Sequence, residues 1–440
     1  MTGERGSIFR NRAFALFWSS QSLSFLGTQI TYVALPLTAV VVLDVTPMEA
    51  GLIAALETLP FLLFGLLVGV FVDHKARRPI LVWADLVRFA ALASIPVAYT
   101  LGVLGIPQIM AVAFLAGVAT VFFEIGYMSY LPGLVGRDRL MEANEKLQAS
   151  SSAADVAGPG IAGGLISVIA APVVIAIDAV SFLVSAVAMV KMPADAAPKA
   201  AADEAEKQSI WALLREGFAV VGRNTLLRWC TVAVFFLSLF FSSVMAIYFL
   251  YLIREAGIRP ATVGLIVAVG SAGGFVGAVL AGRLNAWLGI GPTLVAALAL
   301  PGTGFLLLSI VDGNSVGYAG LAGAATFIGY LGIPVFNVTA VSFRQSITPE
   351  HLQGRVNATV RSLSWGTLAV GSLMGGALAS VVGLRETVII SAAGLFIPSI
   401  LLLLSPVRDM RHPRQRVDDP AEASLAAPAQ QTIESSLGAP

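Results

Sequence analysis

The stretch Gly69-Val-Phe-Val-Asp73-His-Lys-Ala-Arg77-Arg78 decides how the rest of this 440-residue chain is interpreted. It places a compact charge cluster between two long apolar runs, residues 47–72 and 79–103. Each run is longer than the ~20 apolar residues that a helix needs to cross a bilayer. Basic loops stay preferentially on the cytoplasmic side of a membrane. The stretch therefore predicts two membrane-spanning helices joined by a short cytoplasmic turn.

The composition of the whole chain also indicates a membrane protein. Hydrophobic residues make up 57% of it and charged residues only 12%, whereas a soluble domain carries about 25% charged residues. The net charge is +1, and no basic stripe with interleaved aromatic residues is present. These features argue against nucleic-acid binding, so we expect the lipid bilayer, and no nucleic acid, as a partner.

Few residues are suited to catalysis or metal binding inside a membrane. The single cysteine, Cys230, cannot form a disulfide within the chain, and its position at the start of an apolar run suits a small packed residue. The three histidines, His74, His351 and His412, fall in predicted loops or in the tail. No Gly-x-x-x-x-Gly-Lys-Ser/Thr motif for ATP binding occurs. We expect neither an enzyme nor a bound metal or cofactor.

Apolar segments recur along the chain and predict an all-α integral membrane protein. An even number of spans places both termini on one side, and the distribution of Lys and Arg makes that side cytoplasmic. Only Arg254, Arg259 and Arg385 fall on the other side, and Arg88 lies within a span. The twelve predicted spans are 13–40, 47–72, 79–103, 107–130, 143–168, 173–191, 228–253, 261–286, 290–311, 316–342, 358–382 and 386–405.

Two interruptions divide the chain. Residues 193–227 begin with a polar, Ala-rich linker and continue into a possible interfacial helix with Trp211, Leu214 and Phe218 on one face. They separate a bundle of six spans at 1–192 from a second at 228–405. Residues 406–440 are basic at first and then rich in Pro, Ala, Ser and Gln, which predicts a disordered cytoplasmic tail.

The two halves resemble each other. Residues 144–167 align without gaps on residues 357–380, with Gly158 on Gly371 and Gly163 on Gly376. The same offset places Phe123-Glu124 on Phe336-Asn337. Small residues can also match by chance, but the order of the matches favours two parallel repeats.

Several motifs resemble those of the major facilitator superfamily (MFS) over roughly residues 8–405. The Gly69–Arg78 stretch is similar to its loop 2–3 signature, although His74 replaces a usual basic residue and Ala76 a usual glycine. Gly158-Pro-Gly-Ile-Ala-Gly163 resembles the Gly-Pro-x-x-Gly-Gly element of MFS antiporters. Three further stretches look like landmarks of exporters related to macrolide-efflux and enterobactin-export proteins: 177–182, 216–218 and 344–357.

The resemblance implies two six-helix pseudo-repeat bundles and assigns roles to the loop. In the family, the aspartate matching Asp73 faces the positive end of the eleventh helix. The arginine matching Arg77 pairs with an acid low on the fourth helix, for which Glu124 is the candidate. Alternatively, the arginines only fix the topology. The predicted conformational latch comprises Gly69, Asp73, Arg77, Arg78 and Glu124.

The Gly-Pro motif predicts a bendable seam at Gly158, Pro159 and Gly163. Proline removes a backbone hydrogen bond and kinks a helix, while glycines let a neighbouring helix approach closely. Simple helix packing would use the same residues, so both interpretations stay open.

Acidic residues within the spans are candidates for proton coupling, since a charge at membrane depth is costly without a function. Asp155, near the middle of the fifth span, is the first choice, followed by Glu57 and Asp178. Asp85 and Arg88 are three residues apart and can pair on one helix face.

Polar stripes predict a water-filled path between the halves. Asn144, Gln148, Ser151 and Asp155 are spaced four, three and four apart, which places them on one helix face. Hydrogen bonding between helices would explain such stripes equally well. The predicted cavity residues are Gln21, Thr28, Gln148, Ser151, Ser238, Ser242 and Asn337.

The sequence thus predicts a secondary active transporter of the plasma membrane that exports a small apolar or amphipathic compound, a drug or metabolite, by alternating access. We expect protons as the coupling ion and a monomeric protein. A solute importer or a lipid flippase on the same fold is the alternative, followed by a non-transporting sensor or scaffold, because fold alone does not decide function.

Overall fold

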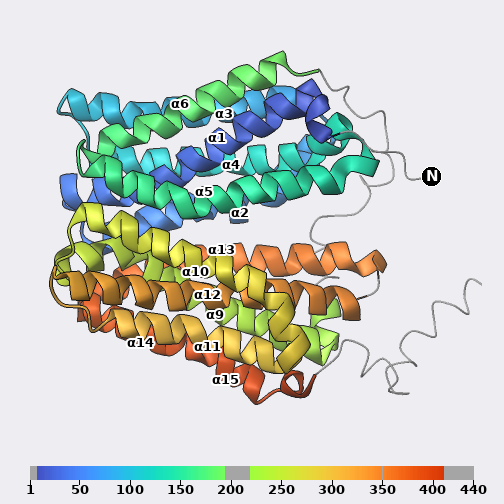
Figure 1. Cartoon of the computed structure of the whole chain (residues 1–440), viewed down its shortest axis with the longest axis vertical. Helices are drawn as coiled ribbons and strands as arrows, with labels where there is room; N and C mark the ends of the chain where they lie inside the picture. Colours follow the sequence, from blue (N-terminus) through green and yellow to red (C-terminus); the bar gives the residue numbers. More distant parts are fainter. Residues whose placement is uncertain (1–6, 194–218, 349, 411–440) are drawn as a thin grey trace, which may run out of the picture.

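The computed structural model describes residues 7–193, 219–348 and 350–410, and every regular element in these ranges is helical (Figure 1). The main helices are α1 (Arg12–Leu37), α2 (Pro47–Asp73), α3 (Arg77–Thr100), α4 (Ile106–Val135), α5 (Leu140–Ile166), α6 (Ala171–Lys191), α9 (Thr225–Leu250), α10 (Pro260–Leu288), α11 (Ile290–Leu308), α12 (Val316–Ile347), α13 (Glu350–Val382), α14 (Leu384–Gly394) and α15 (Phe396–Leu403).

The helices bear out eleven of the twelve predicted membrane spans, and the predicted span at 143–168, which corresponds to α5, is not among the eleven. Within the described residues, 11 stretches are long and apolar enough to cross a membrane, with α14 and α15 together forming one of them. α5, which carries the polar stripe, lies among them against α1 and α10 (Figure 1). α12 and α13 extend beyond the predicted spans at 316–342 and 358–382, because their polar end residues remain helical. α4 extends beyond the predicted span at 107–130 through the mainly apolar residues 131–135.

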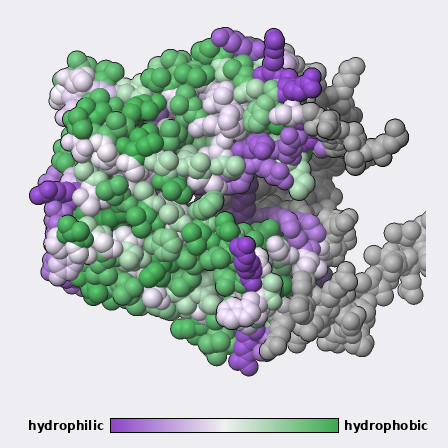
Figure 2. Space-filling model, in the orientation of Figure 1, coloured by the Kyte–Doolittle hydropathy of each residue, from purple (hydrophilic) through white to green (hydrophobic). Residues whose placement is uncertain are grey.

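The helices gather into two groups that lie one beside the other in Figure 1, α1–α6 and α9–α15. Both ends of the described chain lie at the same end of the helices, which we call the terminal end. The other end, with Asp44 and Gly383, is the opposite end. Figure 2 shows an apolar belt around the middle and hydrophilic residues toward both ends. The protein is therefore a multi-pass membrane protein.

The repeat extends beyond the stretch that revealed it. α1 and α9 both end in a π-helical turn, η2 (Thr38–Val42) and η4 (Tyr251–Glu255). The offset that aligns 144–167 on 357–380 superimposes these two turns residue for residue. The two halves therefore share a local backbone irregularity as well as a helix order.

Glycine contacts join the two halves toward the opposite end. Gly163 of α5 lies against Gly264 of α10, and a Cβ on Gly163 would be 2.7 Å from the carbonyl oxygen of Ala261. Gly51 of α2 lies equally close to α13, where a Cβ would be 2.7 Å from the Ser372 carbonyl oxygen. Backbones this close leave no room for a substrate. The halves are thus closed at this end.

The predicted tail is ordered at its start. Pro406–Asp409 forms a 3-10 turn, η5, and the backbone N–H of Gly291 donates to the Met410 carbonyl at 2.8 Å. Val407 and Met410 are buried against the end of α11, so the prediction of disorder from 406 was wrong for these residues. The rest of the predicted tail lies outside the described residues.

Most of the predicted linker at 193–227 also lies outside the described residues, including Trp211, Leu214 and Phe218. Residues 219–223 are helical and lead into α9. Val221 is buried there with Leu227, Val356 and Val360.

Candidate substrate cavity

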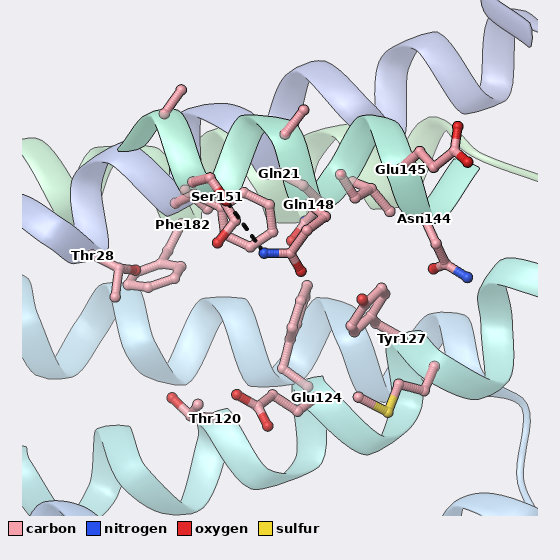
Figure 3. A pocket seen from close by; sticks show the side chains of 18 of the residues that line it. Gln21, Thr28, Thr120, Glu124, Tyr127, Asn144, Glu145, Gln148, Ser151 and Phe182 are labelled. Atoms are coloured by element: carbon pink, nitrogen blue, oxygen red, sulfur yellow. Dashed lines mark hydrogen bonds between the residues drawn. The ribbon is translucent and has the colours of Figure 1, made fainter. Parts of the chain in front are cut away.

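A cavity with a volume of about 1600 Å³ is built mainly by α1, α4 and α5 (Figure 3). Gln148 of α5 and Glu124 of α4 point into it from facing helices. Its lining reaches the first turns of α5, at the terminal end, where Figure 2 shows the surface hollowed between the two halves. We call this space the main cavity.

The structure brings four of the seven predicted cavity residues together in the main cavity: Gln21, Thr28, Gln148 and Ser151. Ser238 and Ser242 instead make hydrogen bonds between helices. The Ser238 hydroxyl lies 3.0 Å from that of Ser364, and the Ser242 hydroxyl donates to the Leu368 carbonyl at 2.8 Å. Ser238 therefore has the contacts of a packing residue, whereas Ser242 makes such a contact and also lines a second, smaller cavity.

A second cavity of about 360 Å³ lies between the halves. Tyr32 and Glu57 of the first half line it together with Met245 and Ser242 of the second. Thr28 lines both this cavity and the main one, so the two adjoin. Glu57 is its single charged lining residue and is exposed to it. Within the described chain, the Glu57 carboxylate has no hydrogen-bond or ion-pair partner, which leaves it available to a proton or a cation.

Asp155 lies one layer behind this second cavity. Its carboxylate is half-buried and accepts a hydrogen bond from the Gln29 amide at 2.5 Å. Gln29 itself lines the cavity. Asp155 is therefore linked to the second cavity through its hydrogen bond with Gln29.

Asp178 is the most enclosed of the three acids, with 1% of its surface exposed. Ser181 donates a hydrogen bond to its Oδ1 at 3.2 Å. A Cβ on Gly27 of α1 would come within 2.6 Å of the same oxygen. Asp178 lines none of the cavities described here, and its contacts are those of a packed helix pair.

The predicted latch residues do not assemble as expected. Glu124 forms an ion pair at 3.4 Å with Arg361 of α13, not with Arg77, because it faces the space between the halves. Arg78 donates to the carbonyls of Met189 at 3.0 Å and Val190, at the end of α6. Gly69 has open space beside it. The Asp73 side chain lies outside what the structure describes.

The two glycines of the predicted seam contact different helices. Gly158 lies against Gln29 of α1, whose Cα would be 3.5 Å from an added Cβ, whereas Gly163 lies against α10 of the other half. Pro159 lies inside α5 between them. α5 is therefore the element through which α1 contacts the second half.

The sequence profile of the transmembrane secretion effector family matches residues 6–433, nearly the whole chain. The chain belongs to this family of MFS transporters.

Relatives of this chain include the multidrug efflux pump Tap of Mycolicibacterium fortuitum, 24% identical over 86% of this chain and 90% of its own length. Macrolide efflux protein A of Streptococcus pyogenes is 22% identical over 90% of this chain and 96% of its own. Among solved structures, the nucleoside transporter NupG has a TM-score of 0.74 at 11% identity, covering 89% of this chain and 98% of its own. A bacterial homologue of ferroportin in an inward-facing state reaches 0.69 at 17% identity, with 89% and 98% covered. The structural neighbours establish the MFS fold alone.

Sequence reasoning assigned no functional role to three arginines that the structure places at cavities, Arg88, Arg344 and Arg361. Arg88 and Asp85 form a buried ion pair, and the Arg88 guanidinium lies between the rings of Phe123 and Phe182, 4.2 and 4.1 Å from their centroids. Arg88 borders the main cavity. The signal was available, since an arginine inside an apolar span needs a reason. Arg344 and Arg361, by contrast, lie near the ends of the predicted spans 316–342 and 358–382, where basic residues usually indicate topology.

Proposed function

We propose that this protein exports a small apolar or amphipathic compound in exchange for protons. The proposal rests on one arrangement: a large cavity that reaches the terminal end and adjoins a second cavity with the unpaired acid Glu57, while glycine contacts close the opposite end. If the terminal end is cytoplasmic, this is an inward-facing conformation. Substrate would enter from the cytoplasm and leave after the halves rock.

Proton coupling follows from where the acids lie. Glu57 and Asp155 flank the second cavity, close to the contacts that must break for the halves to rock. Protonation at either site would remove a charge and alter the packing between helices. The relatives named multidrug and macrolide efflux pumps support export and a substrate of this chemical class. We propose a monomer in the plasma membrane with both termini in the cytoplasm.

Accumulation of an apolar dye such as Nile red, or of a macrolide, in cells expressing the protein tests the proposal. We expect lower accumulation than in cells with the empty vector, and recovery when a protonophore collapses the gradient. Glu57→Gln serves as the matched variant and should behave like the empty vector at equal protein level. Raised accumulation that depends on the gradient would instead establish an importer.

A further inference from the structure

A third cavity lies in the second half, among α9, α12 and α13. Its volume is about 350 Å³, and its polar lining comes from Asn337, Arg344, Asn357, Arg361 and Ser364. No carboxylate occurs among the described residues that line it. It is therefore a positively charged space.

This third cavity is the repeat counterpart of the main cavity. The offset of the internal repeat places Glu124 on Asn337 and Gln148 on Arg361. Asn144, Ser151 and Ser152 fall on Asn357, Ser364 and Trp365 in the same way. Each of these first-half residues lines the main cavity, and each second-half residue lines the third. The two cavities thus occupy equivalent positions in the two halves.

The two equivalent cavities differ in charge. Where the main cavity has the acid Glu124, the third cavity has the amide Asn337. Where the main cavity has the amide Gln148, the third cavity has the guanidinium of Arg361. The main cavity also contains Glu145, and Arg88 at its border is paired with the buried Asp85, while the third cavity contains Arg344. A pair of cavities with opposite charge suits a ligand that carries both charges.

One ion pair connects the main cavity with the third cavity. Arg361, with 51% of its side chain exposed, reaches across the halves to Glu124, which is 37% exposed, at 3.4 Å. An exposed pair of this length contributes little stability, so a ligand can replace it with a closer contact on each side. Arg344 lies in the same cavity, and its Nε–H donates a hydrogen bond to the Asn357 side chain at 3.2 Å, which helps to orient its guanidinium.

An aromatic surface borders the basic residues. Trp365 stacks on Phe61 of α2 with ring centroids 3.9 Å apart and planes 11° from parallel. The stack bridges the two halves beside Arg361. It offers an apolar face to the body of a ligand whose anionic group lies on the arginines.

We propose that Arg344 and Arg361 bind the carboxylate of a zwitterionic amphiphile whose cationic group lies against Glu124. Guanidinium forks match the planar geometry of a carboxylate. The inference rests on the proposed function, since it takes the adjoining main cavity as the place where substrate binds. It narrows the substrate class from amphipathic compounds to those that carry an acid and a base together.

Two matched dyes test this assignment. Rhodamine B carries a carboxylate and a delocalised cation, and its ethyl ester keeps the cation but lacks the acid. Fluorescence anisotropy with the full chain in lipid nanodiscs measures both affinities. We expect wild type to bind the free acid about tenfold more tightly than the ester, as for loss of a charge-assisted hydrogen bond. Arg344→Gln/Arg361→Gln should bind both dyes with the affinity that wild type has for the ester.

Two controls separate this outcome from damage to the fold. Arg283→Gln removes an exposed arginine near the terminal end of α10. Arg283 lines none of the three cavities, so this variant should keep the tenfold preference for the free acid over the ester. Arg361→Lys keeps a positive charge and should retain part of the preference for the free acid. Retained ester binding shows that a variant is folded.

Equal affinities of wild type for the two dyes would overturn the proposal. So would a preference for the acid that survives in the double variant, or a loss of ester binding together with acid binding. Because the measurement needs no gradient and no transport, it can fail while proton-coupled export stands. Export can likewise fail while the preference for the acid is observed.

Discussion

Gln29 of α1 donates its side-chain amide to the Asp155 carboxylate of α5 at 2.5 Å. The same glutamine lines the second cavity, and its Cα and Cβ form the surface against which Gly158 packs. A proton on Asp155 would weaken this charge-assisted bond. The link between α1 and α5 would then loosen where α5 also contacts the other half.

We expect Asp155→Asn to abolish proton-driven transport, with at least a tenfold fall in rate. Asparagine can still accept from Gln29, so the fold should persist while proton exchange is lost. In proteoliposomes, exchange of labelled for unlabelled substrate without a gradient should continue.

Asp312→Asn, at an exposed carboxylate of the opposite end, is the matched control and should transport normally. Wild-type transport by Asp155→Asn would make Asp155 a structural residue. The same measurement on Glu57→Gln then shows whether the unpaired acid carries the proton alone.

The ion pair between Glu124 and Arg361 predicts coupled effects on transport. Glu124→Gln and Arg361→Gln should each slow transport, and the double variant should be no worse than the worse single one. Their coupling energy should be about 0.2–1 kcal/mol, because both side chains are partly exposed. Arg77→Ala combined with Glu124→Gln should give simple addition of the two defects. Non-additive effects of Arg77→Ala and Glu124→Gln would instead support the latch that the sequence predicts.

Closure of the opposite end predicts a strong effect of side-chain size at Gly163. Gly163→Val should prevent closure, since its Cβ would lie 2.7 Å from the Ala261 carbonyl oxygen. Asp44 and Arg254 pair across the halves at 2.5 Å, so cysteines placed at both positions should crosslink readily in the parent chain. The native Cys230 is buried and should not react.

We expect the crosslinking yield to fall severalfold in Gly163→Val. Gly164→Val is the matched control, because a Cβ at Gly164 meets no atom within 4 Å. Equal yields in the two variants would show that the glycine contact does not hold this end closed.

The buried pair of Asp85 and Arg88 predicts a stability effect. Arg88→Met should lower the free energy of unfolding by about 3–5 kcal/mol, because it leaves the fully buried Asp85 without its partner. Asp85→Leu/Arg88→Met removes both charges and should recover most of the loss. Thermal unfolding in detergent measures both variants, and equal stability of the single and double variants would contradict the argument.

Most of the helical frame was predictable, and less of the site was. Apolar runs gave the spans, and the spacing of Asn144, Gln148 and Ser151 gave one wall of the main cavity, since both signals are local. The contrast between Glu57 and Asp178 was not predictable, because it depends on whether another helix covers the acid. Gly27 covers Asp178, whereas a cavity opens beside Glu57.

The partner of Glu124 was missed for a related reason. Arg344 and Arg361, near the ends of predicted spans, satisfy the rule for membrane topology whether or not they also face a cavity. The internal repeat held the additional signal, because its offset places Arg361 on the cavity residue Gln148. Comparing charges between repeat-related positions would have found it.

The two glycine contacts at the opposite end are one contact made twice. Gly163 meets Gly264 and Gly376 meets Gly51, and the repeat offset converts the first pair into the second. An interface in which each partner offers the same two patches is that of a two-fold homodimer. The two halves of this chain therefore meet through a pseudo-two-fold interface. The full chain is in this sense built like a dimer on one polypeptide, in which repeat-related positions such as Gln148 and Arg361 are free to differ in charge.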